Sequence, residues 1–262
     1  EGVKTAYPQG VQAKEFILPK ELLEQDCVIS LSKMKTHALE RITGAVKNSY
    51  GFVYGFHKAK GHTQYPSADS FARMLIDLNK CVAPKLYVMD GIVAMEGNGP
   101  GSGDPVPMNV LLMSTDPVAL DSVFSRLVYL KPEMVPTNYH GEKMGLGTWK
   151  EEEITLLIPD GEISMAEAVE KYGNPAFNVD RTEVRKNIWT RMAGALNIFQ
   201  KKPYIQPDKC VRCGICVQSC PVPGKAVDFR KGKGKPPVYD YRKCIRCFCC
   251  QEMCPKKAIK VK

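Results

Sequence analysis

Eight of the chain's 11 cysteines repeat one spacing near its C-terminal end. Each run reads C-x2-C-x2-C-x3-C-P; the runs are Cys210, Cys213, Cys216 and Cys220 with Pro221, then Cys244, Cys247, Cys250 and Cys254 with Pro255. Three cysteines at this spacing allow one tight loop to hold three corners of a cubane, so the fourth corner must come from elsewhere. The doubled spacing predicts two [4Fe-4S] clusters held by thiolates.

Two other uses of these cysteines are a zinc site and a disulfide framework. Structural zinc usually takes separated C-x2-C or Cys/His pairs rather than a doubled run of this kind. Disulfides are disfavoured because residues 201–262 contain nine cysteines, an odd number. The ninth, Cys249, breaks the spacing, and we expect it to pack beside a cluster without binding it.

The doubled run resembles that of bacterial two-cluster ferredoxins. In those proteins the fourth cysteine of each run ligates the other cluster. The resemblance implies two ligand sets: Cys210, Cys213, Cys216 and Cys254, then Cys244, Cys247, Cys250 and Cys220. It also implies a small ferredoxin-like α+β domain, built from two halves that repeat every 34 residues.

Length and composition fit a protein without a membrane span. The chain has 262 residues, of which 44% are hydrophobic, enough for an α/β core with a small appended domain. No run approaches the roughly 18 to 20 apolar residues that cross a bilayer. Because clusters and unpaired thiols persist in reducing surroundings, we expect a cytoplasmic protein.

The net charge of +9 is unevenly distributed. Residues 201–262 hold 16 Lys and Arg against 4 Asp and Glu, a net charge of +12, whereas the other residues carry −3. Part of this charge lies between the cysteine runs, at Arg230, Lys231, Lys233 and Lys235. We expect an acidic redox partner, although a solvated face has the same composition. Nucleic acid is a lesser alternative because no helix-turn-helix, zinc-finger or RNP motif is present.

Apolar patterning over the first 180 residues alternates between strand and helix. Strands are expected at 27–31, 85–90, 109–113 and 154–158, and helices from 38 onward and at 67–82, 117–127, 164–172 and 181–199. The run at 27–31 predicts a strand buried on both faces, and 33–37 a polar turn at its end. This alternation favours an α/β domain with a mostly parallel sheet, followed by the ferredoxin-like domain. The expected boundaries are 1–180, a connecting helix and linker at 181–202, and 203–262.

Two local patterns have structural explanations. Asp116 before Pro117 is typical of a helix N-cap, so a capping role competes with a functional one. The glycine-rich segment from Gly97 to Gly103 matches neither G-x-x-x-x-G-K-[ST] nor G-x-G-x-x-G before a helix, so it is a weak candidate for phosphate binding.

A series of motifs in residues 20–150 resembles the domain-of-unknown-function family 362. The motifs are SKMKTH (32–37), TGAVKNSYG (43–51), His62, DGIVAMEGNGPGSG (90–103), STDPVALD (114–121) and GLG (145–147). Members are often described as iron–sulfur proteins, and the family name supplies no reaction. Members usually carry further strands before SKMKTH, so the resemblance implies that this chain starts inside the domain.

Six polar residues within these motifs are candidate catalytic residues: Lys35, His37, Lys47, His62, Asp90 and Glu96. The two lysines have the charge to hold a carboxylate or phosphate, and the two histidines can move protons near neutral pH. We expect Lys35, His37 and Lys47 to line a pocket near Asp90, where open α/β sheets bind ligands. A single metal ion on His37, His62 and Glu96 is a weaker hypothesis because no H-x-H or H-E-x-x-H spacing supports it.

Two functions remain open. One is a ferredoxin-linked oxidoreductase, in which the clusters exchange electrons with a small molecule on the α/β domain. The other is an electron carrier or assembly factor whose α/β domain recognises a partner without catalysing a reaction. Neither a flavin nor a nicotinamide fingerprint is present, so hydride chemistry would need another subunit.

Overall fold

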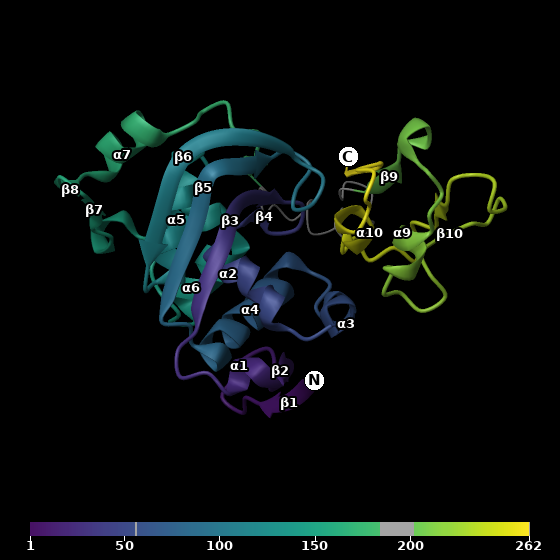
Figure 1. Cartoon of the computed structure of the whole chain (residues 1–262), viewed down its shortest axis with the longest axis horizontal. Helices are drawn as coiled ribbons and strands as arrows, with labels where there is room; N and C mark the ends of the chain where they lie inside the picture. Colours follow the sequence, from purple (N-terminus) through teal and green to yellow (C-terminus); the bar gives the residue numbers. More distant parts are fainter. Residues whose placement is uncertain (56, 184–201, 262) are drawn as a thin grey trace, which may run out of the picture.

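The computed structural model describes residues 1–55, 57–183 and 202–261 (Figure 1). The predicted connecting helix at 181–199 falls almost wholly outside these residues. The strands of the first region are β1 Gly2–Ala6, β2 Glu15–Pro19, β3 Ile29–His37, β4 Arg41–Thr43, β5 Leu86–Glu96, β6 Asp104–Ser114, β7 Leu156–Ile158 and β8 Gly161–Ile163. Its helices are α1 Lys20–Leu23, α2 Ala45–Asn48, α3 His57–Gln64, α4 Ala68–Val82, α5 Pro117–Leu127, α6 Pro136–Lys143 and α7 Met165–Tyr172, with 3-10 turns η1 Ser49–Phe52, η2 Pro132–Met134 and η3 Glu151–Glu153.

The central sheet is mixed, which corrects the prediction of a mostly parallel sheet. Its order is β4-β3-β5-β6, and only β3 and β5 run parallel. The short loop at 97–103 returns the chain directly from β5 to β6, so these strands are antiparallel; a parallel pair would need a crossover of a dozen or more residues. The strand expected at 154–158 forms β7, which pairs with β8 outside this sheet.

The segment at 33–37 is strand rather than the predicted polar turn. Buried Met34 and Thr36 continue the alternation of β3, and Lys35 pairs with Thr43 of β4 and Met95 of β5. The helix expected from Ala38 is replaced by β4 and the short α2. The period-2 alternation of inward side chains decided the conformation here, despite the polar composition.

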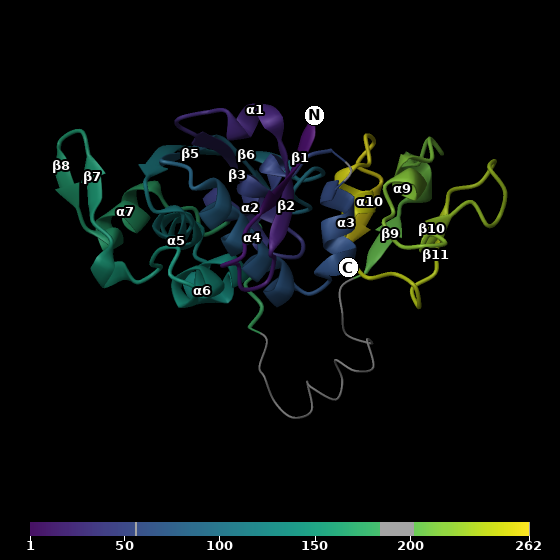
Figure 2. The same ribbon diagram turned by 90° about the horizontal axis from the view of Figure 1, so that it is seen from below.

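Among the residues that the structure describes, no helical layer covers one face of the sheet. In Figure 2 helices α2, α4, α5 and α6 all lie on one side of β3, β5 and β6. On the other face Leu31 and Met113 are 73% and 64% exposed, and both are in register with Val88 between them. The expectation that the strand at 27–31 is buried on both faces is therefore wrong.

Two helices begin where the sequence predicts. Ser67 caps α4, and the carboxylate of Asp116 accepts hydrogen bonds from Val118 N and Ala119 N at the start of α5. The buried faces of these helices supply much of the core, including Phe71, Leu75, Phe124 and Leu127. Asp116 has the capping role, which follows from the preference of Asp for the N-cap position and of Pro for the first helical position.

The cysteine-rich region forms a second, smaller body. It contains β9 Pro203–Ile205, η4 Pro207–Lys209, α9 Ile215–Gln218, β10 Val227–Asp228, β11 Val238–Tyr239, α10 Cys249–Glu252 and β12 Ile259–Val261. Strand β9 pairs with β12 and β10 with β11, all antiparallel. Its two halves repeat in backbone as well as sequence, because Arg212 and Arg246 both have positive φ, as do Gly214 and Phe248. Within the described part of the chain, no helix is long and apolar enough to cross a membrane.

Candidate functional site

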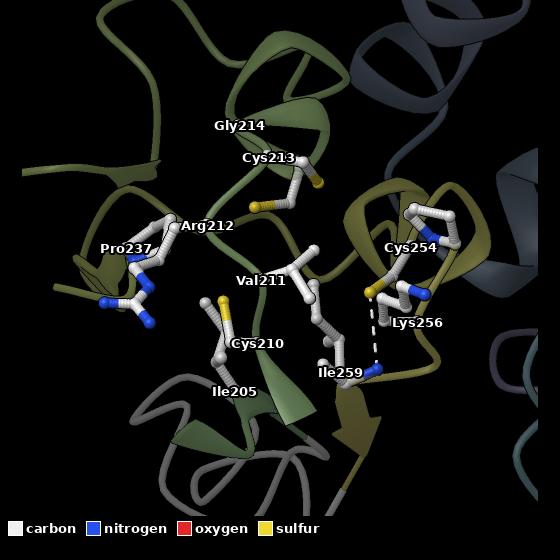
Figure 3. Close-up of a pocket in the computed structure, with 13 residues that line it drawn as sticks. Ile205, Cys210, Val211, Arg212, Cys213, Gly214, Pro237, Cys254, Lys256 and Ile259 are labelled. Carbon is white, nitrogen blue, oxygen red and sulfur yellow. Dashed lines mark hydrogen bonds between the residues drawn. The ribbon is translucent and has the colours of Figure 1, made fainter. Parts of the chain in front are cut away.

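Two cavities in the second body are each lined by four cysteines. We name the first the outer site, lined by Cys210, Cys213, Cys216 and Cys254; Figure 3 shows three of these around the cavity. We name the second the junction site, lined by Cys220, Cys244, Cys247 and Cys250. All eight are free thiols.

The donor chemistry of both sites fits an iron–sulfur cluster. Ala258 N donates to Cys254 Sγ at the outer site and Ala226 N donates to Cys220 Sγ at the junction site, each at 3.3 Å. Hydrogen bonds to ligating sulfurs are a usual feature of cluster environments. Cys249, which we expected to pack without binding, is buried at the start of α10.

The glycine-rich loop at 97–103 contacts the second body. Gln251 Nε2 of α10 donates to Asn98 O at 2.7 Å and to Gly99 O at 2.9 Å, and Asn98 Nδ2 donates to Ile259 O at 2.9 Å. A Cβ on Gly101 would lie 2.8 Å from Glu252 O, so only glycine allows this close approach without displacement. Figure 1 shows this β5–β6 loop beside α10. The loop is thus a docking element.

We call the region that precedes the second body, residues 1–183, the first body. Helix α10 brings a carboxylate to basic residues of this first body. Glu252 Oε1 lies 3.2 Å from His37 Nε2 and 4.0 Å from Lys47 Nζ. Lys35 and His62 are close enough for Glu252 to influence their pKa values. We call Lys35, His37, Lys47, His62 and Glu252 the junction cluster.

Burial controls the protonation of this cluster. It lowers the pKa of His37 to about 4, assisted by the charge of Lys47, and lowers the pKa of His62 to about 4. Burial also lowers the pKa of Lys35, and Lys47 adds to that shift. For Glu252, burial acts to raise the pKa, but Lys47 and the His37 hydrogen bond outweigh it and the pKa falls to about 2. Near neutral pH the imidazoles are uncharged and Glu252 is a carboxylate.

The tautomer of His37 follows from its neighbours. Its Nδ1 accepts hydrogen bonds from Leu39 N and Glu40 N, at 3.1 and 3.0 Å. Because Nδ1 is the acceptor, a neutral ring carries its proton on Nε2, and this N–H donates to Glu252.

Asp121 binds the start of α2, the short helix that carries Lys47. The carboxylate of Asp121 accepts from Ala45 N at 2.5 Å and Val46 N at 3.1 Å, at the N-terminus of α2. A Cβ on Gly44 would clash with this carboxylate, so the glycine permits the contact.

The imidazole ring of His62 stacks on the ring of Phe71, with ring centroids 4.5 Å apart.

Two of the six candidate residues lie elsewhere. Asp90 pairs with Lys33 at 2.6 Å on the open face of the sheet, away from the junction cluster. Glu96 Oε2 accepts from Asn178 N at 2.7 Å, and so joins β5 to the segment after α7. Among the described residues, which include His37, His62 and Glu96, no three His, Cys, Asp or Glu side chains are placed to hold a single metal ion.

Sequence reasoning missed two residues of this region. Glu252 is one of only four acidic residues in 201–262, a signal that would have marked it as unusual. Glu40 is fully buried, and burial raises its pKa well above the usual range.

A cleft of about 490 Å³ opens between the two bodies and reaches His37. Its lining includes Thr36, His37, Arg41, Asn98, Tyr204 and Lys260. A small molecule has room to approach the junction cluster from this side.

Comparison with known proteins agrees with this architecture. Residues 202–255 match the family model described as a 4Fe-4S dicluster domain, so the chain is of the iron–sulfur, electron-transfer class. Residues 1–126, just under half of the chain, match the model described as Domain of unknown function (DUF362), so this region of the chain resembles that family. Both resemblances recognised in the sequence are confirmed.

One curated protein similar to this chain is the "Thylakoid-associated protein sll1697" of Synechocystis sp. (strain ATCC 27184 / PCC 6803 / Kazusa). It is 42% identical over 130 residues, which are 49% of this chain and 40% of the relative. The chain thus matches less than half the length of that relative. No solved structure matches the chain.

Proposed function

We propose that the chain is a ferredoxin-linked oxidoreductase that reduces or oxidises a small anion bound at the junction cluster. In this proposal the outer site and the junction site each hold one [4Fe-4S] cluster. Such clusters, when bound, exchange single electrons. The four thiols at each cavity and the matching N–H donors support this assignment.

The observation that carries the proposal is the contact of α10 with the first body. This helix bears Cys250 of the junction site and, two residues later, Glu252, which faces His37 and Lys47. Electrons at the junction site would therefore need to travel only a short path to a molecule held by the basic side chains.

The charge of the junction cluster favours an anion. Lys35 and Lys47 supply two cations against the single carboxylate of Glu252, because both imidazoles are neutral near pH 7. A buried cation without a counter-charge is costly, so a carboxylate or phosphate group is the expected occupant. We assign the Nε2–H of His37 a hydrogen-bonding role beside the bound anion, because a neutral imidazole is a poor proton donor.

Substitution of Lys47 by Met tests this function. Protein reduced anaerobically and freed of excess reductant is mixed with fumarate, pyruvate or nitrite, and cluster reoxidation is followed by absorbance. We expect at least one of these anions to reoxidise the clusters, and Lys47→Met to slow that reaction at least tenfold with iron content unchanged. Lys33→Met is the matched control, because Lys33 lies in the same motif but on the open sheet face.

The second candidate function is an electron carrier, in which Lys35 and Lys47 only offset the negative charge of the clusters. Its support is the exposed basic surface between the cysteine runs, which suits an acidic protein partner. If no small anion reoxidises the clusters but an acidic flavodoxin does, this function takes precedence. The curated relative is named as thylakoid-associated. We therefore propose a location beside a membrane in addition to the cytoplasmic location that the sequence led us to expect.

A further inference from the structure

A tyrosine hydroxyl bonds to one of the cluster-site cysteines. Tyr239 Oη lies 3.2 Å from Cys250 Sγ at the junction site. A ligating cysteine is a thiolate, which only accepts hydrogen bonds, and a phenol keeps its proton near neutral pH because its ordinary pKa is about 10. The O–H group of Tyr239 is therefore the donor.

This bond breaks the symmetry between the two halves of the domain. Tyr239 stands five residues before Cys244, and Ile205 stands five residues before Cys210, at the equivalent position of the 34-residue repeat. Tyr239 lines the junction site. Ile205 lines the outer site, which Figure 3 shows. An isoleucine side chain has no O–H or N–H group, so it cannot donate a hydrogen bond. The repeat therefore supplies this donor to the junction site only.

Both sites also receive a backbone N–H bond of 3.3 Å to sulfur, from Ala226 to Cys220 at the junction site and from Ala258 to Cys254 at the outer site. At the junction site the side chains of Cys249 and Cys247 form a further hydrogen bond, which the Tyr239 substitution leaves in place. The side chain at the Tyr239 position is thus a local chemical difference between two sites of common backbone design.

The sites also differ in exposure. At the junction site Cys220, Cys247 and Cys250 are buried, whereas Cys213 of the outer site is exposed. The junction site is also the one next to α10, the helix that contacts the first body. An external electron donor reaches the outer site more readily.

We propose that Tyr239 raises the reduction potential of the junction-site cluster, so that an electron entering at the outer site settles at the junction site. This rests on the cluster assignment made above. One electron leaves the reduced outer cluster, which becomes oxidised, and the junction cluster takes it up and is reduced. The added charge spreads onto the thiolates, and a hydrogen bond to Cys250 Sγ stabilises that reduced state more than the oxidised one. Burial of the junction site lowers the reduction potential, because it disfavours the added negative charge. The hydroxyl of Tyr239 offsets this effect.

Tyr239→Phe tests this by removing only the hydroxyl. The full chain is titrated anaerobically against potential, with the two clusters followed by electron paramagnetic resonance. We expect one of the two potentials to fall, so that the oxidised-to-reduced ratio of that cluster rises about tenfold at a fixed potential, the scale of a hydrogen bond to a charged group. The other potential should stay unchanged, as should iron and sulfide content.

Tyr241→Phe is the matched control. Tyr241 stacks on Tyr239 with centroids 5.6 Å apart, but its hydroxyl donates to Pro203 O. We expect both potentials to be unaffected. Equal shifts of both potentials in Tyr239→Phe, or no shift at full iron content, would overturn the proposal.

A second variant covers the case in which Tyr239→Phe loses a cluster. Replacing Tyr239 by 3-fluorotyrosine keeps the ring and makes the hydroxyl a stronger donor, so one potential should rise; an unchanged potential would refute the tuning role. These outcomes are separate from the small-anion assay. Failure of every anion to reoxidise the clusters defeats the oxidoreductase function and leaves the Tyr239 effect intact.

Discussion

Glu252 links the chemistry of the two bodies through one side chain. It lies between Cys250 and Cys254 in the sequence, and its carboxylate contacts His37 and approaches Lys47 in the structure. Its low pKa results from these neighbours outweighing burial. The residue therefore depends on the first body for its charge state, and the first body depends on it for neutralising Lys47.

The neutral imidazoles of His37 and His62 predict a loss of stability in acid. Burial lowers both pKa values to about 4, below the ordinary value of about 6.5. Between these values the unfolded chain binds more protons than the folded one, so the free energy of unfolding falls as pH drops from about 6.5 toward 4, by up to about 1.4 kcal/mol per pH unit for each ring. Anaerobic urea unfolding between pH 7.5 and 5.5 measures this slope.

The double variant His37→Gln, His62→Gln is the corresponding control. It removes both titrating rings, so its unfolding free energy should vary less with pH over this interval. A slope equal to that of the unmodified chain would show that other groups cause the acid sensitivity.

The β5–β6 loop is the element that joins the two bodies. Gln251, Asn98 and Lys257 provide its hydrogen bonds, and Gly101 allows the backbone of α10 to approach. We predict that Gly101→Ala loosens this contact, because the new Cβ would meet Glu252 O at 2.8 Å. Small-angle scattering should show a larger radius of gyration at unchanged iron content.

Gly51→Ala is the matched control for this substitution. A Cβ at Gly51 meets no atom within 4 Å among the described residues, and Gly51 has no positive φ. Its radius of gyration should equal that of the unmodified chain. Equal radii for both variants would mean that the contact tolerates a methyl group and that the loop does not control docking.

Local signals in the sequence were sufficient for some elements and insufficient for others. Ser67 and Asp116 mark helix starts because capping involves residues only two or three apart. The cysteine spacing is similarly local, and the dicluster match confirms what it implied for cluster type. In contrast, the mixed sheet depends on which strands pair, and no local pattern reports that. The segment 33–37 was predicted to be a polar turn because charged residues flank Met34 and Thr36, whose side chains are buried in the structure.

The junction cluster could be predicted only in part. Lys35, His37, Lys47 and His62 were chosen from motifs, and the structure places all four near Glu252. The contact with Glu252 spans about two hundred residues of sequence, and no local pattern reports it. Asp90 shares a motif with the loop, but it lies beside Lys33 and pairs with it, whereas Lys35 lies beside Met95 near the end of β5.

The charge of the whole molecule predicts salt-dependent electron transfer. Lys231, Lys233 and Lys235 are exposed, while Arg230 pairs with Asp240 at 3.4 Å and belongs to the local structure. Replacing the three lysines by Ser should slow electron transfer with an acidic flavodoxin and flatten its dependence on salt, because the Debye length is only about 8 Å at physiological ionic strength. Stopped-flow rates between low and high salt measure the effect.

Cluster content should not change in this triple variant. A rate that is independent of salt and of the three lysines would remove the acidic-partner prediction. Tight binding of nucleic acid that is lost in the variant would instead favour the nucleic-acid alternative.

We propose that two clusters occupy crossed cysteine sets, one of them beside the first body. Anomalous diffraction at the iron edge from anaerobically grown crystals locates the iron atoms and so tests this proposal. We predict two four-iron peaks, one within Cys210, Cys213, Cys216 and Cys254 and the other within Cys220, Cys244, Cys247 and Cys250. A single iron peak, a zinc signal, or clusters each ligated by one uncrossed run of four cysteines would contradict the account.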